Sequence, residues 1–399
     1  MVPELRRAYN AAFSPEKYQS LVRNLDAAAG RHIEFRISET PIFLSPQLTE
    51  SLVEAAHEVL RAVSSAEYLS QSRRAVPAGH STPGEEGHPA FLQIDFALTR
   101  GAGADGAIVP QLIELQGFPS LYGFQWLLAR EFRSCFDGAV PPSWTTYFGG
   151  LDDAGYAERL RELIVGDRDP DEVVLLEIEP EKQKTWVDFA CTERLLGIRT
   201  VSTAAVVERG GRLFHRVDGR ELPIRRIYNR VIQDEVERKG LALDHLFRRE
   251  LDVEWVGHPN WFFRISKFSL PFIRSRYAPP AFFVSDLETY PDDLEHYVLK
   301  PLFSFAGLGV EMGVTPERLR AIENPQDFIL QRKVDYVPLI ETPEGGAKAE
   351  VRMMFIWRDR PLLVNNLVRM SKGAMMGVDF NKDKTWIGAS VGFHPPQAP

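Results

Sequence analysis

The chain has 399 residues and a net charge of −8, and 44% of its residues are hydrophobic. This length and composition are typical of a globular protein built from two or three packed units. The acidic balance argues against nucleic acid or an anionic membrane as a partner, because both carry negative charge. Two cysteines are too few for a disulfide framework or a zinc site. We see no signal peptide and no apolar run of about 20 residues, so we expect a cytoplasmic protein.

Residues 1–75 are predicted to be mainly helical. The motifs Ser14-Pro15-Glu16 and Ser45-Pro46 can each cap and start a helix. Apolar residues then recur at helical spacing from Leu48 to Val63. Residues 75–90 are rich in glycine and proline and predict a loop.

Residues 91–116 predict a β-hairpin. Phe91–Arg100 and Ile108–Gln116 are expected to be its strands, joined by the glycine-rich turn Gly101–Gly106. Because side chains alternate along a strand, we expect the apolar ones to lie together on one face. These are Leu92, Ile94, Phe96 and Leu98 on the first strand and Ile113 and Leu115 on the second.

The opposite face of this hairpin carries Asp95, Glu114 and Gln116. Two carboxylates and an amide oxygen form an oxygen-only ligand set, which Mg²⁺ prefers. The alternative is an ordinary solvated face, because alternation normally turns polar groups outward.

Residues 151–260 predict an α/β unit with a parallel sheet, because strands and helices alternate along the chain. In order, we expect the strand Val173–Ile178, the helix Lys184–Gly197, the strand Thr200–Val207, the strand Arg225–Val231 and the helix Gln233–Leu246. After Asn260, short strands and turns are expected to dominate.

The strand Arg225–Val231 is unusually polar. It carries Arg226, Tyr228, Asn229 and Arg230, and arginines on both faces are costly to bury without anionic partners. A site for a carboxylate- or phosphate-bearing substrate would supply such partners. A structural salt-bridge network would supply them equally well.

Residues 297–310 are the most informative stretch. An apolar strand delivers Lys300 to its end, and the loop Ser304–Gly309 follows at once. The ammonium can neutralise phosphate charge, and Gly307 and Gly309 let backbone N–H groups approach phosphate oxygens. A glycine-rich hairpin turn is the alternative.

Three later strands carry further candidates. Phe328–Tyr336 turns polar at Gln331 and can present backbone groups to an adenine edge, although it could also be a plain edge strand. The strands Glu350–Trp357 and Pro361–Met370 carry Arg352 and Arg369, whose guanidinium groups can bind phosphate or join surface ion pairs. A small-residue loop follows over residues 371–378.

Together these residues resemble the ATP-grasp superfamily, and more narrowly its circularly permuted branch with the glutathionylspermidine synthetase-like ligases. The acidic residues precede Lys300 here, whereas in the usual order the nucleotide-binding lysines come first. The resemblance implies an α+β ATP-grasp fold with an α/β Rossmann-like subdomain, which precedes the ATP site in ordinary members. We expect a helical region at 1–90, a metal-binding part at 91–150, the α/β substrate unit at 151–260 and a nucleotide-binding part at 261–399.

The resemblance also assigns roles to individual residues. Lys267 and Lys300 resemble the nucleotide lysines, and residues 303–309, with Ser304, resemble the flap over the phosphates. The hinge that binds adenine and ribose corresponds to Gln331, Lys333, Val334 and Asp335, and the magnesium ligands correspond to Asp95, Glu114 and Gln116. Arg369 and Arg352 correspond to the cations near the γ-phosphate, and Ser120 lies in the stretch that corresponds to the substrate-side loop.

Two residues depart from the family pattern. Gln116 replaces the usual asparagine, and Gln93 stands where related ligases often have an arginine. The family implies an ATP- and Mg²⁺-dependent ligase that joins a carboxylate to an amine through an acyl phosphate, on a small molecule or peptide. A phosphoryl transferase and a non-catalytic nucleotide-binding protein are the alternatives. The identity of the acid and the amine and the oligomeric state stay open.

Overall fold

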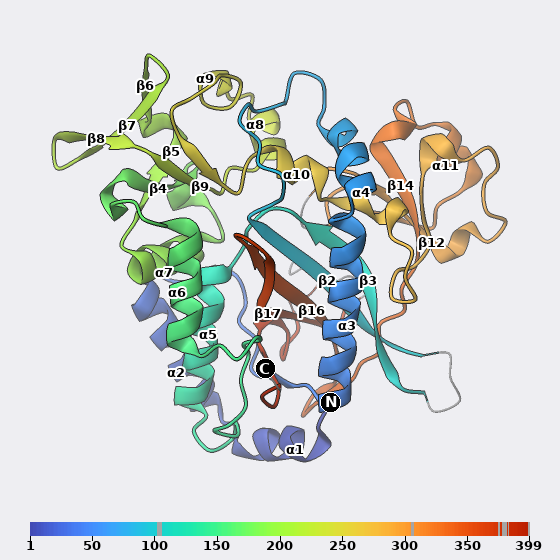
Figure 1. Ribbon diagram of the computed structural model, residues 1–399. Coiled ribbons are helices and arrows are strands. Elements are labelled where there is room, and N and C mark those ends of the chain that lie inside the picture. Colours follow the sequence, from blue (N-terminus) through green and yellow to red (C-terminus); the bar gives the residue numbers. More distant parts are fainter. Residues whose placement is uncertain (102–105, 305–306, 374–375, 377–380, 382, 398–399) are drawn as a thin grey trace.

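The computed structural model describes residues 1–101, 106–304, 307–373, 376, 381 and 383–397. The chain folds into a mixed α+β structure around a central antiparallel sheet (Figure 1). A parallel sheet and a second, smaller antiparallel sheet lie on either side of it in this view. Parts of three predicted loops, at residues 102–105, 305–306, 374–375 and 377–378, fall outside the described residues.

The central sheet joins strands from the first third and the last part of the chain, in the order β18-β17-β16-β2-β3, with β15 paired to β16. Neighbouring strands are antiparallel throughout. Their bounds are β2 (Phe91–Arg100), β3 (Ile108–Gln116), β15 (Ile340–Thr342), β16 (Gly345–Trp357), β17 (Pro361–Ser371) and β18 (Gly388–Ser390). The predicted hairpin is thus confirmed, and it is extended by the two later strands.

One face of the central sheet is covered by α3 (Pro46–Val63), which crosses it in Figure 1. Leu92, Ile94 and Phe96 on this face are buried in the same apolar core as the helix. The Ser45 side chain accepts a hydrogen bond from Leu48 N at 3.4 Å, which confirms the predicted cap.

The other face of the sheet is apolar at one end and charged in the middle. At the apolar end, Phe91, Met354 and Ile356 pack in a core shared with a group of helices. These helices are α2 (Pro15–Ala29), α5 (Tyr122–Cys135), α6 (Asp153–Ile164) and α7 (Trp186–Leu196). The charged middle of this face is where the candidate site lies.

The predicted parallel sheet is confirmed, with the order β10-β9-β4-β5 and parallel pairing throughout. Its strands are β4 (Val173–Glu177), β5 (Arg199–Ser202), β9 (Arg226–Asn229) and β10 (Glu254–Val256). Gly197 ends α7 in the left-handed conformation, with φ 75°, as its position after the helix predicts.

Two predicted elements in this unit are wrong in extent. The helix expected at 233–246 is interrupted: α8 (Gln233–Arg238) ends before Gly240, which has φ 61°, and α9 (Asp244–Phe247) follows. The strand expected over 200–207 stops at Ser202, because the Ser202 side chain caps a short 3₁₀ turn by accepting from Ala204 N at 3.4 Å.

The smaller antiparallel sheet has the order β11-β14-β12-β13 and lies beside the hairpin β2–β3 in Figure 1. Its strands are β11 (Ala281–Phe283), β12 (Tyr297–Pro301), β13 (Glu311–Met312) and β14 (Phe328–Arg332), and α11 (Pro316–Arg320) covers it. β12 ends just after Lys300, as the sequence predicts.

The remaining elements connect these layers. They are α1 (Pro3–Ala12), α4 (Ala66–Gln71), α10 (Asn260–Arg264), a parallel pair of β1 (Ile42–Phe43) and β19 (Gly392–Phe393), and the hairpins of β6 (Val207–Arg209), β7 (Arg212–Val217) and β8 (Arg220–Ile224). In the part of the chain that the structure describes, none of the helices has the length and hydropathy to cross a bilayer. The four-region division of the chain stays a prediction.

Candidate functional site

The register of the hairpin sets the positions of the first site residues. Asp95 on β2 lies opposite Glu114 on β3, and Gln93 lies opposite Gln116. The two carboxylates and the amide therefore share one face, as strand alternation predicts. On the other side of β2, Arg352 of β16 lies opposite Asp95.

A β-bulge in β3 corrects one detail of the prediction. The register shifts so that Phe96 faces Leu112, which leaves Ile113 as the extra residue, away from the core face that holds Leu115. A bulge redirects the backbone groups of the extra residue. Here the carbonyl oxygen of Ile113 accepts a hydrogen bond from Lys300 Nζ at 3.1 Å, so the bulge anchors the predicted nucleotide lysine.

The chain packs very closely where β3 ends. Gly117 N donates to the carbonyl of Ile265 at 2.8 Å, and a Cβ on Gly117 would lie 2.6 Å from the Trp261 carbonyl oxygen. Only glycine fits this approach. It brings Lys267, at the start of the 3₁₀ helix Lys267–Phe272, to the end of the hairpin.

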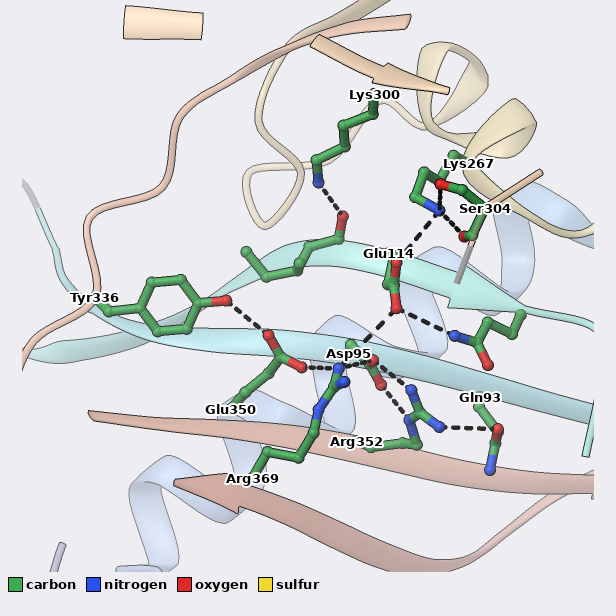
Figure 2. A network of polar contacts seen from close by, with 12 residues as sticks. Gln93, Asp95, Glu114, Lys267, Lys300, Ser304, Tyr336, Glu350, Arg352 and Arg369 are labelled. Atoms are coloured by element: carbon green, nitrogen blue, oxygen red, sulfur yellow. Dashed lines mark hydrogen bonds and ion pairs between the residues drawn. The ribbon is translucent and has the colours of Figure 1, made fainter. Parts of the chain in front are cut away.

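The structure brings both predicted lysines and the loop serine next to Glu114 (Figure 2). Lys267 Nζ lies 3.8 Å from Glu114 Oε2 and donates to the Ser304 carbonyl oxygen and to Ser304 Oγ, the latter at 3.4 Å. Gln116 Nε2 donates to Glu114 Oε1 at 3.1 Å. Residues almost two hundred positions apart thus meet in one cluster.

The charges in this cluster shift one another's pKa values. Burial alone would raise the pKa of Glu114, but the nearby cations, above all Lys267 and Arg369, outweigh it and lower this pKa to about 2. Burial lowers the pKa of Lys300 to about 8, and the charge of Lys267 adds to that shift while Glu114 opposes it. Glu114 is therefore charged near neutrality, and Lys300 is close to its titration point.

Asp95 is held by two arginines. Its Oδ1 accepts from Arg352 Nε at 2.5 Å, and its Oδ2 accepts from Arg352 Nη2 and from Arg369 Nη2, each at 2.7 Å. Arg352 Nη1 also donates to Gln93 Oε1 at 3.2 Å, and Gln93 Nε2 donates to the Ser120 carbonyl at 2.6 Å. Both predicted γ-phosphate arginines thus lie on the same face as Asp95 and pair with it.

Two residues of this network escaped the sequence-based prediction. Glu350 accepts hydrogen bonds from Arg369 and from Tyr336 Oη, the latter at 2.7 Å (Figure 2). Burial raises the pKa of Glu350, although Arg369 opposes this. Glu350 lies two residues before Arg352 on β16, and this spacing, which puts both on one face, was the available signal.

The predicted adenine residues lie along the end of β14 and the segment after it. Gln331 is buried, and its Nε2 donates to the carbonyl of Leu112 at 3.2 Å, which ties β14 to β3. Lys333 and Asp335 are exposed, Val334 is half-buried, and Lys333 N donates to the His296 carbonyl at 2.7 Å. Gln331 thus contacts the hairpin directly.

In the loop after β12, Gly307 and Gly309 have φ values of 77° and 69°, which favour glycine. Both are exposed. Residues 305–306 of the predicted flap fall outside the described residues, so its closure stays a prediction.

The predicted substrate residues of β9 make protein contacts of their own. Arg226 Nη1 pairs with Glu254 Oε2 at 2.7 Å, on the neighbouring strand β10. Tyr228 is buried with its ring centroid 5.4 Å from that of Phe91, and Asn229 Nδ2 donates to the Gly257 carbonyl at 3.1 Å. These contacts occupy part of the polar groups, while Arg226 Nε and the Tyr228 hydroxyl are buried without a hydrogen-bond partner among the residues that the structure describes. The substrate role of these residues stays a prediction.

Arg230 forms the most buried ion pair of β9. Its guanidinium donates to Asp188 on α7, and both side chains are almost inaccessible, at 3% and 0% exposure. Asp188 also accepts from the backbone N–H groups of Leu121 and Phe124, each at 3.0 Å. Asp188, which the sequence did not single out, therefore fixes the start of α5 directly after the Ser120 loop.

A small cavity lies beside the lysine cluster, lined among others by Glu114, Gln116, Lys267, Phe303 and Ser304. Its volume is about 20 Å³, which is enough for about one water molecule. To admit a nucleotide, the loop after β12 would have to move away from Glu114. This movement would break the contact between Lys267 and Ser304.

Within the described ranges, no group of three His, Cys, Asp or Glu side chains is arranged to hold a metal ion. The cause is visible in Figure 2, where the carboxylates of Asp95 and Glu350 accept hydrogen bonds from arginine and tyrosine. Glu114 and Gln116 also carry oxygen atoms, but Asp95 does not fit a metal ligand in this arrangement. The predicted magnesium trio is thus close together in space, but both oxygens of Asp95 already accept hydrogen bonds from arginine.

In sequence, the chain matches no protein-family model, and no curated protein matches it. In structure, the chain is similar to a glutathione synthetase-like effector from Globodera pallida in its apo form, with a TM-score of 0.57 and 9% identity. The match covers 96% of this chain and 98% of that chain.

At this identity the likeness concerns the fold. The chain has a mixed α+β fold that resembles this glutathione synthetase-like structure over nearly its whole length. The expected α+β fold class is therefore confirmed.

Proposed function

We propose that this protein is an ATP-grasp ligase that uses ATP to join a carboxylate to an amine, with the chain order of the circularly permuted branch. One observation carries the proposal. Lys267 and Ser304 meet Glu114 at one small cavity, and Lys300 donates to the carbonyl of Ile113, the residue before Glu114. The fold likeness supports the same reading.

In this proposal the two lysines take up the phosphates. Lys267 lines the cavity, and Lys300 is buried next to Glu114 with its ammonium on the Ile113 carbonyl. A bound polyphosphate would meet these charges where water screens them weakly. The substrate carboxylate attacks the γ-phosphate, ADP leaves, and the amine then displaces phosphate from the acyl phosphate. The chain positions the reactants and neutralises charge, and the loop after β12 excludes water from the intermediate.

The residues of the site also decide whether it can hold magnesium. The donor set in the structure does not fit a protein-held Mg²⁺, because the Asp95 and Glu350 oxygens already accept hydrogen bonds. No step of the proposed reaction therefore uses a magnesium ion held by the protein. Among the predicted ligands, Glu114 and Gln116 lie at the cavity that would receive the phosphates.

The proposal is tested in two steps. Titration calorimetry should first show binding of a non-hydrolysable ATP analogue to the wild-type protein and much weaker binding to Lys267→Met. Incubation with ATP and panels of acids and amines should then release ADP and phosphate together, and mass spectrometry should find an amide. Release of ADP without phosphate would indicate a phosphoryl transferase instead.

A second candidate is a nucleotide-binding protein without ligase activity. The specific observation that favours it is the bidentate pair of Asp95 with Arg352, which fixes a predicted metal ligand as a structural residue. Gln93, in place of the family's arginine, binds the Ser120 backbone. Analogue binding with no turnover for any acid–amine pair would support this candidate over the ligase.

A further inference from the structure

Three carboxylates from three different strands surround one nitrogen atom of Arg369. Its Nη2 lies 2.7 Å from Asp95 Oδ2 and 4.0 Å from Glu114 Oε1, and it donates to Glu350 Oε1. Figure 2 shows Arg369 reaching up from β17 to this point between the acidic side chains. A single N–H₂ group thus stands at the centre of an acidic cluster.

The carboxylates around this nitrogen are removed from solvent. The side chains of Asp95 and Glu350 are 1% and 3% exposed, and that of Glu114 is 19% exposed. Such groups lose hydration, and an uncompensated charge among them would be strongly unfavourable. Some cation must therefore be present among them.

Two kinds of cation could fill this position. Oxygen atoms converging from separate strands are what a divalent ion such as Mg²⁺ uses in proteins. A guanidinium supplies one positive charge and fixed N–H donors instead. Because Arg369 Nη2 already bonds to Asp95 and Glu350, a metal ion cannot occupy the same space.

We propose that Arg369 is a built-in cation that takes the place of a protein-held divalent metal ion in this site. The ligand-free protein then binds no metal ion at this cluster. Arg369, together with Lys267 and Lys300, supplies the positive charge that a bound anion meets. This inference deepens the proposed function, because it concerns the same site.

Arg352 has a different role. It donates one N–H group to each oxygen of Asp95 and a third to Gln93. Its described hydrogen bonds reach neither Glu114 nor Glu350. It orients Asp95 toward Arg369. Replacing Arg369, and not Arg352, is therefore the change that vacates the centre of the cluster.

The test is metal binding in the absence of nucleotide, with Mn²⁺ as the probe and its electron paramagnetic resonance signal as the readout. Wild-type protein should leave the signal of free Mn²⁺ unchanged. Arg369→Gln should bind one Mn²⁺ at least about tenfold more tightly than the wild type, because a repelling charge is gone and Asp95 and Glu350 each lose the hydrogen bond from Arg369. Mn²⁺ should also raise the Tm of this variant and leave the wild-type Tm unchanged.

Three further variants complete the test. Arg369→Lys keeps the positive charge and Tyr336→Phe keeps Arg369, so neither should bind Mn²⁺. The double variant Glu350→Gln, Arg369→Gln has one carboxylate fewer, so it should fold if the single variant does not, and it should bind Mn²⁺ more weakly than the single variant.

Two results would overturn the inference. One is tight Mn²⁺ binding by the nucleotide-free wild type. The other is a folded Arg369→Gln protein that is as indifferent to Mn²⁺ as the wild type. Neither measurement uses ATP, so failure of the proposed ligase function would show only in the analogue titration and the turnover assay.

Discussion

Two charged regions of this protein look alike in the sequence and differ in the structure. The strand β9 and the residues that flank it carry three arginines, and the central sheet has acidic and basic residues spread over four strands. Each arginine in or beside β9 has a partner of its own: Arg225 pairs with Asp252, Arg226 with Glu254 and Arg230 with Asp188. In the central sheet the charges are shared, and Asp95 and Glu350 both bond to Arg369.

The difference lies in where the partners come from. Glu254 lies directly opposite Arg226 on the adjacent strand, so this charge is neutralised locally. The central cluster gathers Lys267 and Lys300 from outside the sheet, and its lysines and arginines outnumber the carboxylates Asp95, Glu114 and Glu350. The high density of charged residues around β9 is therefore explained by structural ion pairs, and it does not by itself indicate a ligand site. Convergence of charge from several elements is the stronger indication.

The largest expected effect belongs to the buried pair of β9. Arg230→Ala should lower the free energy of unfolding by about 3–5 kcal/mol, because it leaves Asp188 charged and buried without its partner. Urea denaturation followed by circular dichroism measures this. Arg225→Ala is the matched control, because its pair with Asp252 is exposed and should contribute about 0–1 kcal/mol. A stable Arg230→Ala protein with a raised substrate KM would instead make Arg230 a substrate-binding residue.

The next effect should appear in nucleotide binding and not in stability. Lys300→Met should weaken binding of an ATP analogue by about tenfold to a hundredfold, which corresponds to the loss of a charge-assisted hydrogen bond. The Tm should not fall, because a neutral side chain of similar length suits the buried position. Lys182→Met is the control, since Lys182 is exposed and pairs with Glu179 on the parallel-sheet side. Equal affinities for both variants would remove Lys300 from the site.

A smaller effect is expected from pH. Burial sets the pKa of Lys300 to about 8 in the free protein, and a bound polyphosphate would raise it. Lys300 is charged below this value and loses its proton above it, so affinity for the analogue should fall about tenfold between pH 7 and pH 9. Lys300→Arg should flatten the profile, because arginine keeps its proton throughout this range. Identical slopes for both proteins would contradict the assignment.

The smallest effect should come from the edge of the network. Tyr336→Phe removes the hydrogen bond to Glu350 but leaves Arg369 paired with it. We expect a loss of about 1 kcal/mol in the free energy of unfolding, the usual contribution of one hydrogen bond. A loss as large as that of Arg230→Ala would show that the central cluster depends on Tyr336 as strongly as β9 depends on its ion pair.

Much of this site could be predicted from local patterns. The common face of Asp95, Glu114 and Gln116 follows from strand alternation, and it survives the bulge because the extra residue, Ile113, lies before Glu114. Lys300 stands at a strand end that its apolar neighbours define. The bulge itself was unpredictable, because no glycine or proline marks it in the sequence.

Other parts were beyond local reasoning. Strand spacing places Glu350 on the face of Arg352, but its pairing with Arg369 and Tyr336 depends on the tertiary structure, as does the pairing of Asp188 with Arg230. None of these pairs is linked by a helix or strand period. The interrupted helix at 233–246 is different, since Gly240 was visible in the sequence and its preference for positive φ decided the break.

The hairpin, the parallel α/β unit and the residue types that can meet a polyphosphate follow from periodicity and from side-chain chemistry within short stretches, so they could be predicted from the sequence. Which of those charges lie together depends on how the elements pack. This packing gives Asp95 two arginine partners and puts Arg369 among three carboxylates. The reason is physical: hydrogen bonds and ion pairs act over a few ångströms of space, and the distance along the chain does not fix that separation.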